Sequence, residues 1–190
     1  MGKEMNAKHY DKELRDLHIH EHRWYDLYEE ASKFLPPPSR CKTIELGCGV
    51  GGFAELLYKK GYREYIGIDF SAYGIKTCKK RVPDFKFIQA NILDSSTQKK
   101  VRKNNSAVVV VLEVLEHINK DLVLISSIPE GRTIVFSVPS FDYNSHVRFF
   151  NNMEEVKGRY KNLLEFQEEK VVEKREKLNQ EMFLFKTVRL

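Results

Sequence analysis

A glycine-rich segment between a short apolar run and a helical pattern constrains this chain more than any other feature. The segment reads Glu-Leu-Gly-Cys-Gly-Val-Gly-Gly at residues 45–52, after Thr43 and Ile44 and before the helical pattern of residues 53–60. Glycine lacks Cβ, so the backbone can turn sharply there and approach a ligand closely. The first N–H groups of the following helix point at whatever lies over the turn. Strand, glycine turn and helix predict the first half of a nucleotide-binding βαβ unit.

Two later apolar runs support this interpretation. Residues 65–68 end at Asp69, roughly 20 residues beyond the loop, where such a unit places an acid against ribose hydroxyls. Ser71 then fits the N-cap of the next helix. Residues 107–112, Ala-Val-Val-Val-Val-Leu, are typical of a buried parallel strand and lead directly into Glu-Val-Leu-Glu-His at residues 113–117.

Length and composition favour one globular domain with a sizeable core. The chain has 190 residues, of which 42% are hydrophobic and 31% are charged. The net charge of +5 is modest, and its basic clusters, within residues 76–86 and 99–103, read as solvated helix faces and loops. A nucleic-acid-binding surface is the alternative interpretation of these clusters. The charged N-terminus resembles no signal peptide and no apolar run could span a bilayer, so we expect a cytoplasmic protein without a membrane partner.

Strands and helices alternate over most of the chain, which predicts a parallel sheet with right-handed crossovers. After a helix over residues 12–35, we expect strands near residues 43–46, 65–68, 85–89, 107–112 and 133–138, with helices at 53–60, 71–81 and 118–128. Residues 94–105 read as a weak helix or a loop.

The C-terminal part has a different pattern. A helix is expected over residues 152–164, followed by strands at 166–172 and 182–188 with a charged turn between them. Two strands joined by a short polar turn predict an antiparallel hairpin. A helix over residues 167–180 is the alternative, because Glu, Lys and Gln favour helix.

Together, the pattern Glu45-x-Gly47-x-Gly49-x-Gly51, the later Asp69 and the segment at residues 113–117 resemble class I S-adenosylmethionine-dependent methyltransferases. The resemblance implies a Rossmann-like, doubly wound, seven-stranded α/β sheet, mostly parallel, that ends in an antiparallel hairpin. It divides the chain into an N-terminal helical cap, residues 1–40, and a single cofactor-binding domain, residues 41–190. Dinucleotide-binding domains share the glycines and the ribose acid, but they usually lack the acid at position 45.

The resemblance also implies a set of residues around S-adenosylmethionine. Glu45 lies beneath the loop near the aminoacyl end of the cofactor, Asp69 holds the ribose diol, and Phe70 lies against the adenine. Asn91 stands where many relatives carry Asp facing the adenine amino group. Leu112 and Glu113 face the methionine portion of the cofactor. The implied cofactor residues are Glu45, Gly47, Cys48, Gly49, Gly51, Asp69, Phe70, Asn91, Ile92, Leu112 and Glu113.

Candidate catalytic residues follow the strands that end near the cofactor. His146 and Arg148 lie in an aromatic-rich loop, residues 139–150, after the last parallel strand, where open α/β sheets bind ligands. His117 is a further candidate, although local packing is its commoner role in this family. His18 and His22 could share a helix face able to hold a metal, but we interpret that face as solvated or lining the rim. The cysteines form no CxxC pair, and no metal ligand is assigned.

Three functions are consistent with these residues. The first is O- or N-methylation of a small-molecule acceptor whose identity the sequence leaves open. The second is methylation of nucleic acid, because Glu113, Glu116, His117 and His146 resemble the metal-binding set of small-RNA 3′-terminal 2′-O-methyltransferases. The third is a non-catalytic cofactor-binding regulator.

Overall fold

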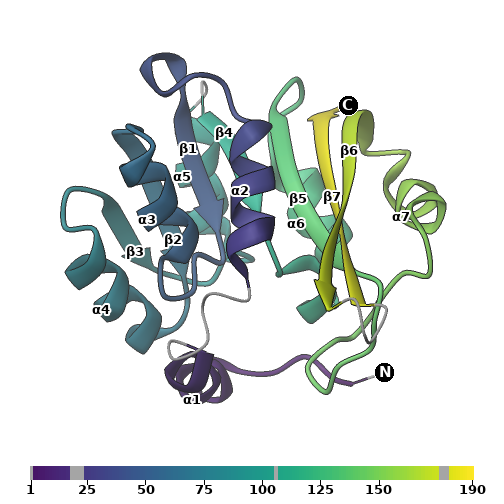
Figure 1. Cartoon of the computed structure of the whole chain (residues 1–190), viewed down its shortest axis with the longest axis horizontal. Helices are drawn as coiled ribbons and strands as arrows, with labels where there is room; N and C mark the ends of the chain where they lie inside the picture. The colour runs from purple at the N-terminus through teal and green to yellow at the C-terminus, as the bar shows by residue number, and fades with distance from the viewer. Residues whose placement is uncertain (1, 18–23, 105–106, 176–179) are drawn as a thin grey trace.

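A seven-stranded sheet forms the centre of the molecule, with the strand order β3-β2-β1-β4-β5-β7-β6 (Figure 1). The computed structural model describes residues 2–17, 24–104, 107–175 and 180–190. Strands β1 to β5 are parallel, and β7 pairs antiparallel with both β5 and β6. The strands are β1 (Lys42–Leu46), β2 (Glu64–Asp69), β3 (Lys86–Gln89), β4 (Ala107–Val111), β5 (Thr133–Pro139), β6 (Leu164–Arg175) and β7 (Gln180–Arg189). The predicted fold class is therefore confirmed.

Helices cover both faces of this sheet. The apolar side chains of α2, α3 and α4 share one core cluster, and those of α5, α6 and α7 share the other. Strand β4 lies between them, so all five of its residues are buried, as the β-branched run predicts. The helices are α1 (Ala7–Leu17), α2 (Tyr25–Lys33), α3 (Gly52–Lys59), α4 (Ala72–Arg81), α5 (Ser95–Lys103), α6 (Asp121–Ser127) and α7 (Met153–Tyr160), with 3-10 turns η2 (Pro38–Arg40) and η3 (Leu115–His117).

Local signals fix where several of these helices begin. The Ser71 hydroxyl accepts a hydrogen bond from the Gly74 N–H at 2.9 Å and so caps α4, as predicted. Asn152 caps α7 in the same way, accepting from the Glu155 N–H at 2.9 Å. Gly51 precedes α3 with φ of 84°, a left-handed conformation that favours glycine.

The structure corrects the predicted elements at the N-terminus and extends them at the C-terminus. Within the described residues, the single helix expected over residues 12–35 is represented by α1, which begins earlier than expected at Ala7, and by α2. Helix α2 contributes to the same core as α3 and the sheet. The division of the chain into a cap of residues 1–40 and a domain of residues 41–190 stays a prediction. Residues 95–103 form a helix, and the hairpin forms in place of the alternative helix over residues 167–180. His18, His20 and His22 lie outside the described residues.

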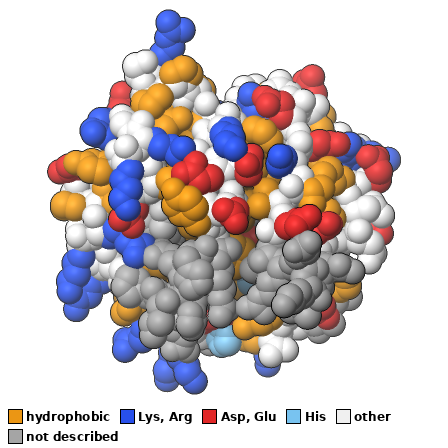
Figure 2. Space-filling model, in the orientation of Figure 1, with side chains coloured by type: hydrophobic (Ala, Val, Ile, Leu, Met, Phe, Trp, Pro, Cys, Tyr) orange, Lys and Arg blue, Asp and Glu red, His pale blue; other side chains and the backbone are white. Residues whose placement is uncertain are grey.

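The surface carries charge of both signs. On the face in Figure 2, Lys and Arg side chains are frequent along the left edge, where Figure 1 places α4. Acidic side chains lie among basic ones toward the middle of the same face. Of the helices in the described part of the chain, not one has both the length and the apolar character that crossing a membrane requires.

Candidate active site

A cavity of about 340 Å³ lies at the carboxyl ends of β1, β2 and β4. The strand order reverses between β1 and β4, and such switch points are where open α/β sheets bind ligands. Helix α1 lies beyond these strand ends in Figure 1. The cavity is lined by every implied cofactor residue except Gly51, namely Glu45, Gly47, Cys48, Gly49, Asp69, Phe70, Asn91, Ile92, Leu112 and Glu113.

The glycine loop forms one wall and leaves little room for side chains. The N–H groups of Gly47 and Cys48 both donate to the Ile68 carbonyl, at 2.7 and 3.2 Å, which holds the loop against β2. Gly47 has φ of 83°, and a Cβ there would lie 2.3 Å from a methyl carbon of Val114. Gly51 does not line the cavity but caps the start of α3. It therefore shapes the loop without facing the ligand.

Asp69 presents a nearly buried carboxylate to the cavity. Its side chain accepts hydrogen bonds from the backbone N–H groups of Gly49, at 2.9 Å, and Ser71, at 2.8 Å. Burial raises the pKa of Asp69 to about 6, although these two hydrogen bonds oppose the shift. The carboxylate thus ties the glycine loop to the end of β2 and can accept further hydrogen bonds from a ligand hydroxyl.

Glu45 lies deeper, at the end of β1, and is 3% exposed. The Tyr65 hydroxyl donates a hydrogen bond to its carboxylate. Burial raises the pKa of Glu45 to about 8, and the negative charge of Asp69 adds to the rise, against the hydrogen bond from Tyr65. A cation that binds nearby would favour the ionised form.

These shifts predict that the cofactor-free protein loses stability as the pH rises. The pKa of Glu45 goes from 4.5 to about 8 on folding, so its contribution is complete below pH 4.5 and is lost as the pH rises through about 8. Glu45→Gln stays neutral throughout. Relative to wild type, we expect it to gain roughly 2–4 kcal/mol between pH 5 and pH 8, measured by urea unfolding. Equal pH dependence in the two proteins would contradict the burial of an acid with a raised pKa.

A glycine outside the loop also shapes the cavity. Gly74, in the first turn of α4, packs so closely that a Cβ would lie 2.5 Å from the Gly49 carbonyl oxygen. Gly74→Ala should therefore displace the loop and weaken the binding of S-adenosylhomocysteine at least about tenfold, or about 1.4 kcal/mol. Gly158→Ala in α7 is the matched control, because nothing lies within 4 Å of its Cβ position. Calorimetry measures the affinity of each variant for S-adenosylhomocysteine. Equal affinities in the two variants would show that the contact between Gly74 and Gly49 does not shape the binding site.

The segment after β4 also lines the cavity, and it contains a strained residue, Glu113. Glu113 has φ of 56°, and among the described residues it is the one residue other than glycine with a positive φ. Its N–H donates to the Ser137 hydroxyl on β5 at 3.0 Å. Backbone conformations of this kind cost energy and cluster at active sites. The strain thus supports a functional part for the cavity wall at Glu113.

Two of the three predicted catalytic side chains line the cavity. His146 is 3% exposed, and its ring lies 4.9 Å from that of His117, centroid to centroid. The Nδ1 atom of His146 lies 3.1 Å from the Phe141 carbonyl oxygen, and that of His117 lies 3.0 Å from the Ser145 carbonyl oxygen. The two loops after β4 and β5 therefore bring their histidines together at the cavity.

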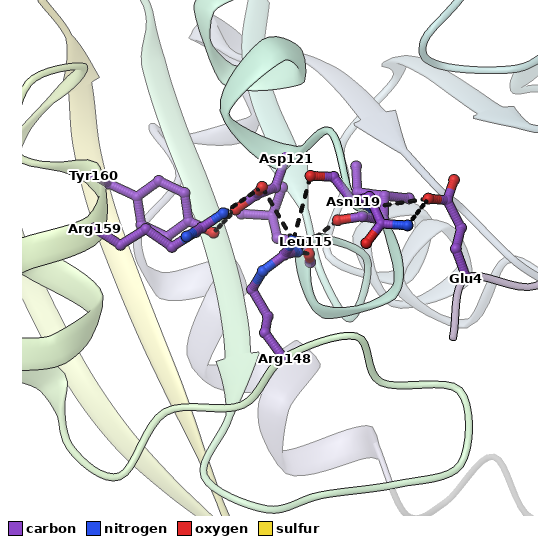
Figure 3. A network of polar contacts seen from close by, with 8 residues as sticks. Glu4, Leu115, Asn119, Asp121, Arg148, Arg159 and Tyr160 are labelled. Carbon is purple, nitrogen blue, oxygen red and sulfur yellow. Dashed lines mark hydrogen bonds and ion pairs between the residues drawn. The ribbon is translucent and has the colours of Figure 1, made fainter. Parts of the chain in front are cut away.

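Arg148 does not line the cavity, and its contacts do not fit the catalytic part that the sequence suggested. Figure 3 shows its guanidinium directed at the segment after β4. It donates to the carbonyls of Leu115 and Ile118, the second at 2.6 Å, and lies 3.3 Å from a carboxylate oxygen of Asp121. We therefore assign Arg148 to anchoring the loop that carries His146.

The N-terminal segment supplies cavity residues that the sequence did not identify. Tyr10, Leu14, Trp24 and Tyr28 all line the cavity, the first two from α1. Asp11 of α1 accepts hydrogen bonds from the Ser71 hydroxyl and from the backbone of α4. The helical spacing of apolar residues predicts a helix here at the rim, but it cannot show which side chains reach the cavity.

Comparisons with known proteins agree with this geometry. Residues 15–169 match a family described as "Methyltransferase domain". The trans-aconitate 2-methyltransferase of Rhodopseudomonas palustris (strain HaA2) is 31% identical over 117 residues, which are 60% of this chain and 44% of that protein. A second such protein, from strain BisB5, is 29% identical over 110 residues. The chain thus spans less than half the length of the curated relatives it matches.

Solved structures share the fold at low sequence identity. The Bradyrhizobium japonicum N-methyltransferase NodS, in complex with S-adenosyl-L-homocysteine, aligns with a TM-score of 0.66 and 18% identity, over 88% of this chain and 87% of that one. A methyltransferase from Anabaena variabilis, described as S-adenosylmethionine-dependent, aligns with a TM-score of 0.73 and 12% identity, over 100% and 98% of the two chains.

The residues present fit the cofactor of such enzymes. The loop has no room for a Cβ at Gly47 beside Val114, an acceptor carboxylate lies at Asp69, and a buried acid lies at Glu45 beneath the loop. With a family match over residues 15–169, which is most of its length, this chain belongs to the methyltransferase family.

Proposed function

We propose that this protein is an S-adenosylmethionine-dependent enzyme that methylates an oxygen or nitrogen atom of a small-molecule acceptor. The observation that carries the proposal is the size of the cavity, about 340 Å³, together with the N-terminal segment that lines it. Ligand sites in general measure roughly 300–1,000 Å³. A cavity near the lower limit that must also receive part of the cofactor favours a small acceptor.

The character of the walls supports the same proposal. Trp24, Tyr28, Phe141 and Tyr143 offer aromatic surface that can bury an apolar part of the acceptor. His146 and His117 supply polar groups on one side of the cavity. We propose that the acceptor lies between these aromatic side chains and the histidines, facing the wall formed by Leu112 and Glu113.

The roles that we propose for the cofactor and for the protein side chains follow from the chemistry of methyl transfer. When bound, the cofactor supplies a methyl group that its sulfonium already activates. The protein then mainly has to align the acceptor with that group, and proximity can lower the barrier by roughly 7–11 kcal/mol at best. A base is needed where the acceptor loses a proton, and we propose that His146 or His117 accepts it. Asp69 and Phe70 hold the ribose and adenine in this proposal, with Asn91 and Ile92 beside them.

The names of the relatives support a small-molecule acceptor, since the curated ones are named for methylation of trans-aconitate, a small molecule.

A screen with radiolabelled S-adenosylmethionine tests the proposal, with a metabolite library in one arm and RNA in the other. We expect label in the metabolite arm. Label in RNA alone would support the second function from the sequence, and tight cofactor binding without turnover would support the regulator. A cytoplasmic location remains part of the proposal.

A further inference from the structure

Three potential metal ligands converge at the cavity from two separate loops. Glu116 and His117 lie in η3, in the connection between β4 and α6, and His146 lies in the loop after β5. One ligand atom from each of the three side chains lies within 4.8 Å of the others. Carboxylate oxygen and imidazole nitrogen are common ligands of divalent transition metals, and two histidines with one carboxylate leave further coordination positions open.

The hydrogen bonds of the two histidines prepare them for this role. Each Nδ1 atom faces a backbone carbonyl oxygen, at 3.0 Å for His117 and 3.1 Å for His146. A carbonyl oxygen only accepts, so each neutral ring carries its proton on Nδ1 and keeps the lone pair on Nε2. Metal-binding histidines are usually oriented in this way, by a carbonyl or carboxylate behind the ring.

The charge around the cluster favours a cation. Glu116 is completely buried. Glu4 and Glu13 line the cavity. A divalent cation would offset the negative charge of these carboxyl groups.

The two ligand-bearing loops are also fixed to each other. The Val147 N–H donates to the Glu116 carbonyl at 2.8 Å, one residue from His146. Arg148 donates to the carbonyls of Leu115, the first residue of η3, and of Ile118, which directly follows η3 (Figure 3). A site whose ligands are held by surrounding hydrogen bonds needs little rearrangement to bind an ion.

We propose that Glu116, His117 and His146 bind one divalent transition-metal ion, of the class of Mn²⁺, Co²⁺ or Zn²⁺, and that its open positions hold an oxygen atom of the acceptor. The binding of the ion stands on the cluster alone, whereas its part in holding the acceptor rests on the proposed function. This assignment replaces the expectation from the sequence that the chain has no metal ligand. With the ion bound, the Nε2 lone pairs of His117 and His146 hold the metal, so neither histidine then serves as the base that accepts the proton of the acceptor.

Calorimetry of the full chain, freed of metal with a chelator, tests the site directly with Co²⁺ and Mn²⁺ as probes. We expect one equivalent of either ion to bind, and visible absorption of bound Co²⁺ to report nitrogen and oxygen ligands. Glu116→Gln and His117→Ala should each weaken binding at least tenfold. S-adenosylhomocysteine titrated into each variant shows whether the cavity is still folded.

The matched control replaces His18, His20 and His22 with alanine, because neighbouring histidines can bind these ions on their own. Retained binding in this control, with loss in both cluster variants, would support the site. Loss in the control alone, or no binding by wild type, would overturn it. If the ion binds but no acceptor is methylated, the proposed function fails and the metal site stands. Full turnover by metal-free enzyme would refute the part assigned to the ion at the acceptor.

Discussion

Asp121→Ala should lower the free energy of unfolding by about 3–5 kcal/mol, the usual cost of removing one partner from a buried ion pair. Asp121 is completely buried at the start of α6. Arg159 donates to its two oxygens at 2.7 and 2.8 Å, and the Tyr160 hydroxyl donates at 2.8 Å. Arg148 approaches from the other side (Figure 3). The substitution leaves two guanidinium groups without the carboxylate that compensates them.

Urea unfolding measures this effect, and Asp26→Ala is the control. Asp26 is exposed in the first turn of α2, so its loss should cost less than about 1 kcal/mol. Because Asp121 also helps to hold Arg148, the variant should weaken the attachment of the loop that carries His146. A loss below about 1 kcal/mol for Asp121→Ala would show that the network contributes little to stability.

Asp69→Ala should weaken the binding of S-adenosylhomocysteine by roughly 1–3 kcal/mol, the cost of leaving buried hydrogen-bond partners unmatched. The variant loses the acceptor assigned to the ribose, and it also frees the N–H groups of Gly49 and Ser71. Asp69→Asn keeps the shape and one acceptor oxygen, so its loss should be smaller. Calorimetry on folded variants decides the matter, and an unchanged dissociation constant for Asp69→Ala would refute the ribose assignment.

The order of elements could be predicted from the sequence because its signals are local. The run of valines at residues 107–112 requires apolar neighbours on both sides and becomes β4. Ser71 caps α4 as its place after Asp69 indicates. The hairpin was harder to predict, because β6 contains many Glu and Lys residues, and its strand form depends on pairing with β7. Tertiary pairing here outweighs the intrinsic preference for helix.

The cavity residues that follow directly after strands could be predicted for the same reason, and their binding of the cofactor stays a prediction. The part of the cavity that carries His146 depends on contacts between segments far apart in the chain. Arg148 stands two residues from His146, yet it turns away to the segment after β4. Tyr10 reaches the cavity only because α1 packs against α4. Nothing in the spacing of residues reports such contacts, and the positive φ of Glu113 has no sequence signal at all.

Calorimetry with S-adenosylhomocysteine and, separately, NAD tests the central claim most directly. Both ligands carry an adenosine that a glycine loop and an acid at position 69 could hold. Only the first carries the amino-acid portion that Glu45 and the wall at Glu113 are expected to face. The account predicts binding of S-adenosylhomocysteine and no measurable binding of NAD. Micromolar affinity for NAD, with no response to S-adenosylhomocysteine, would contradict it.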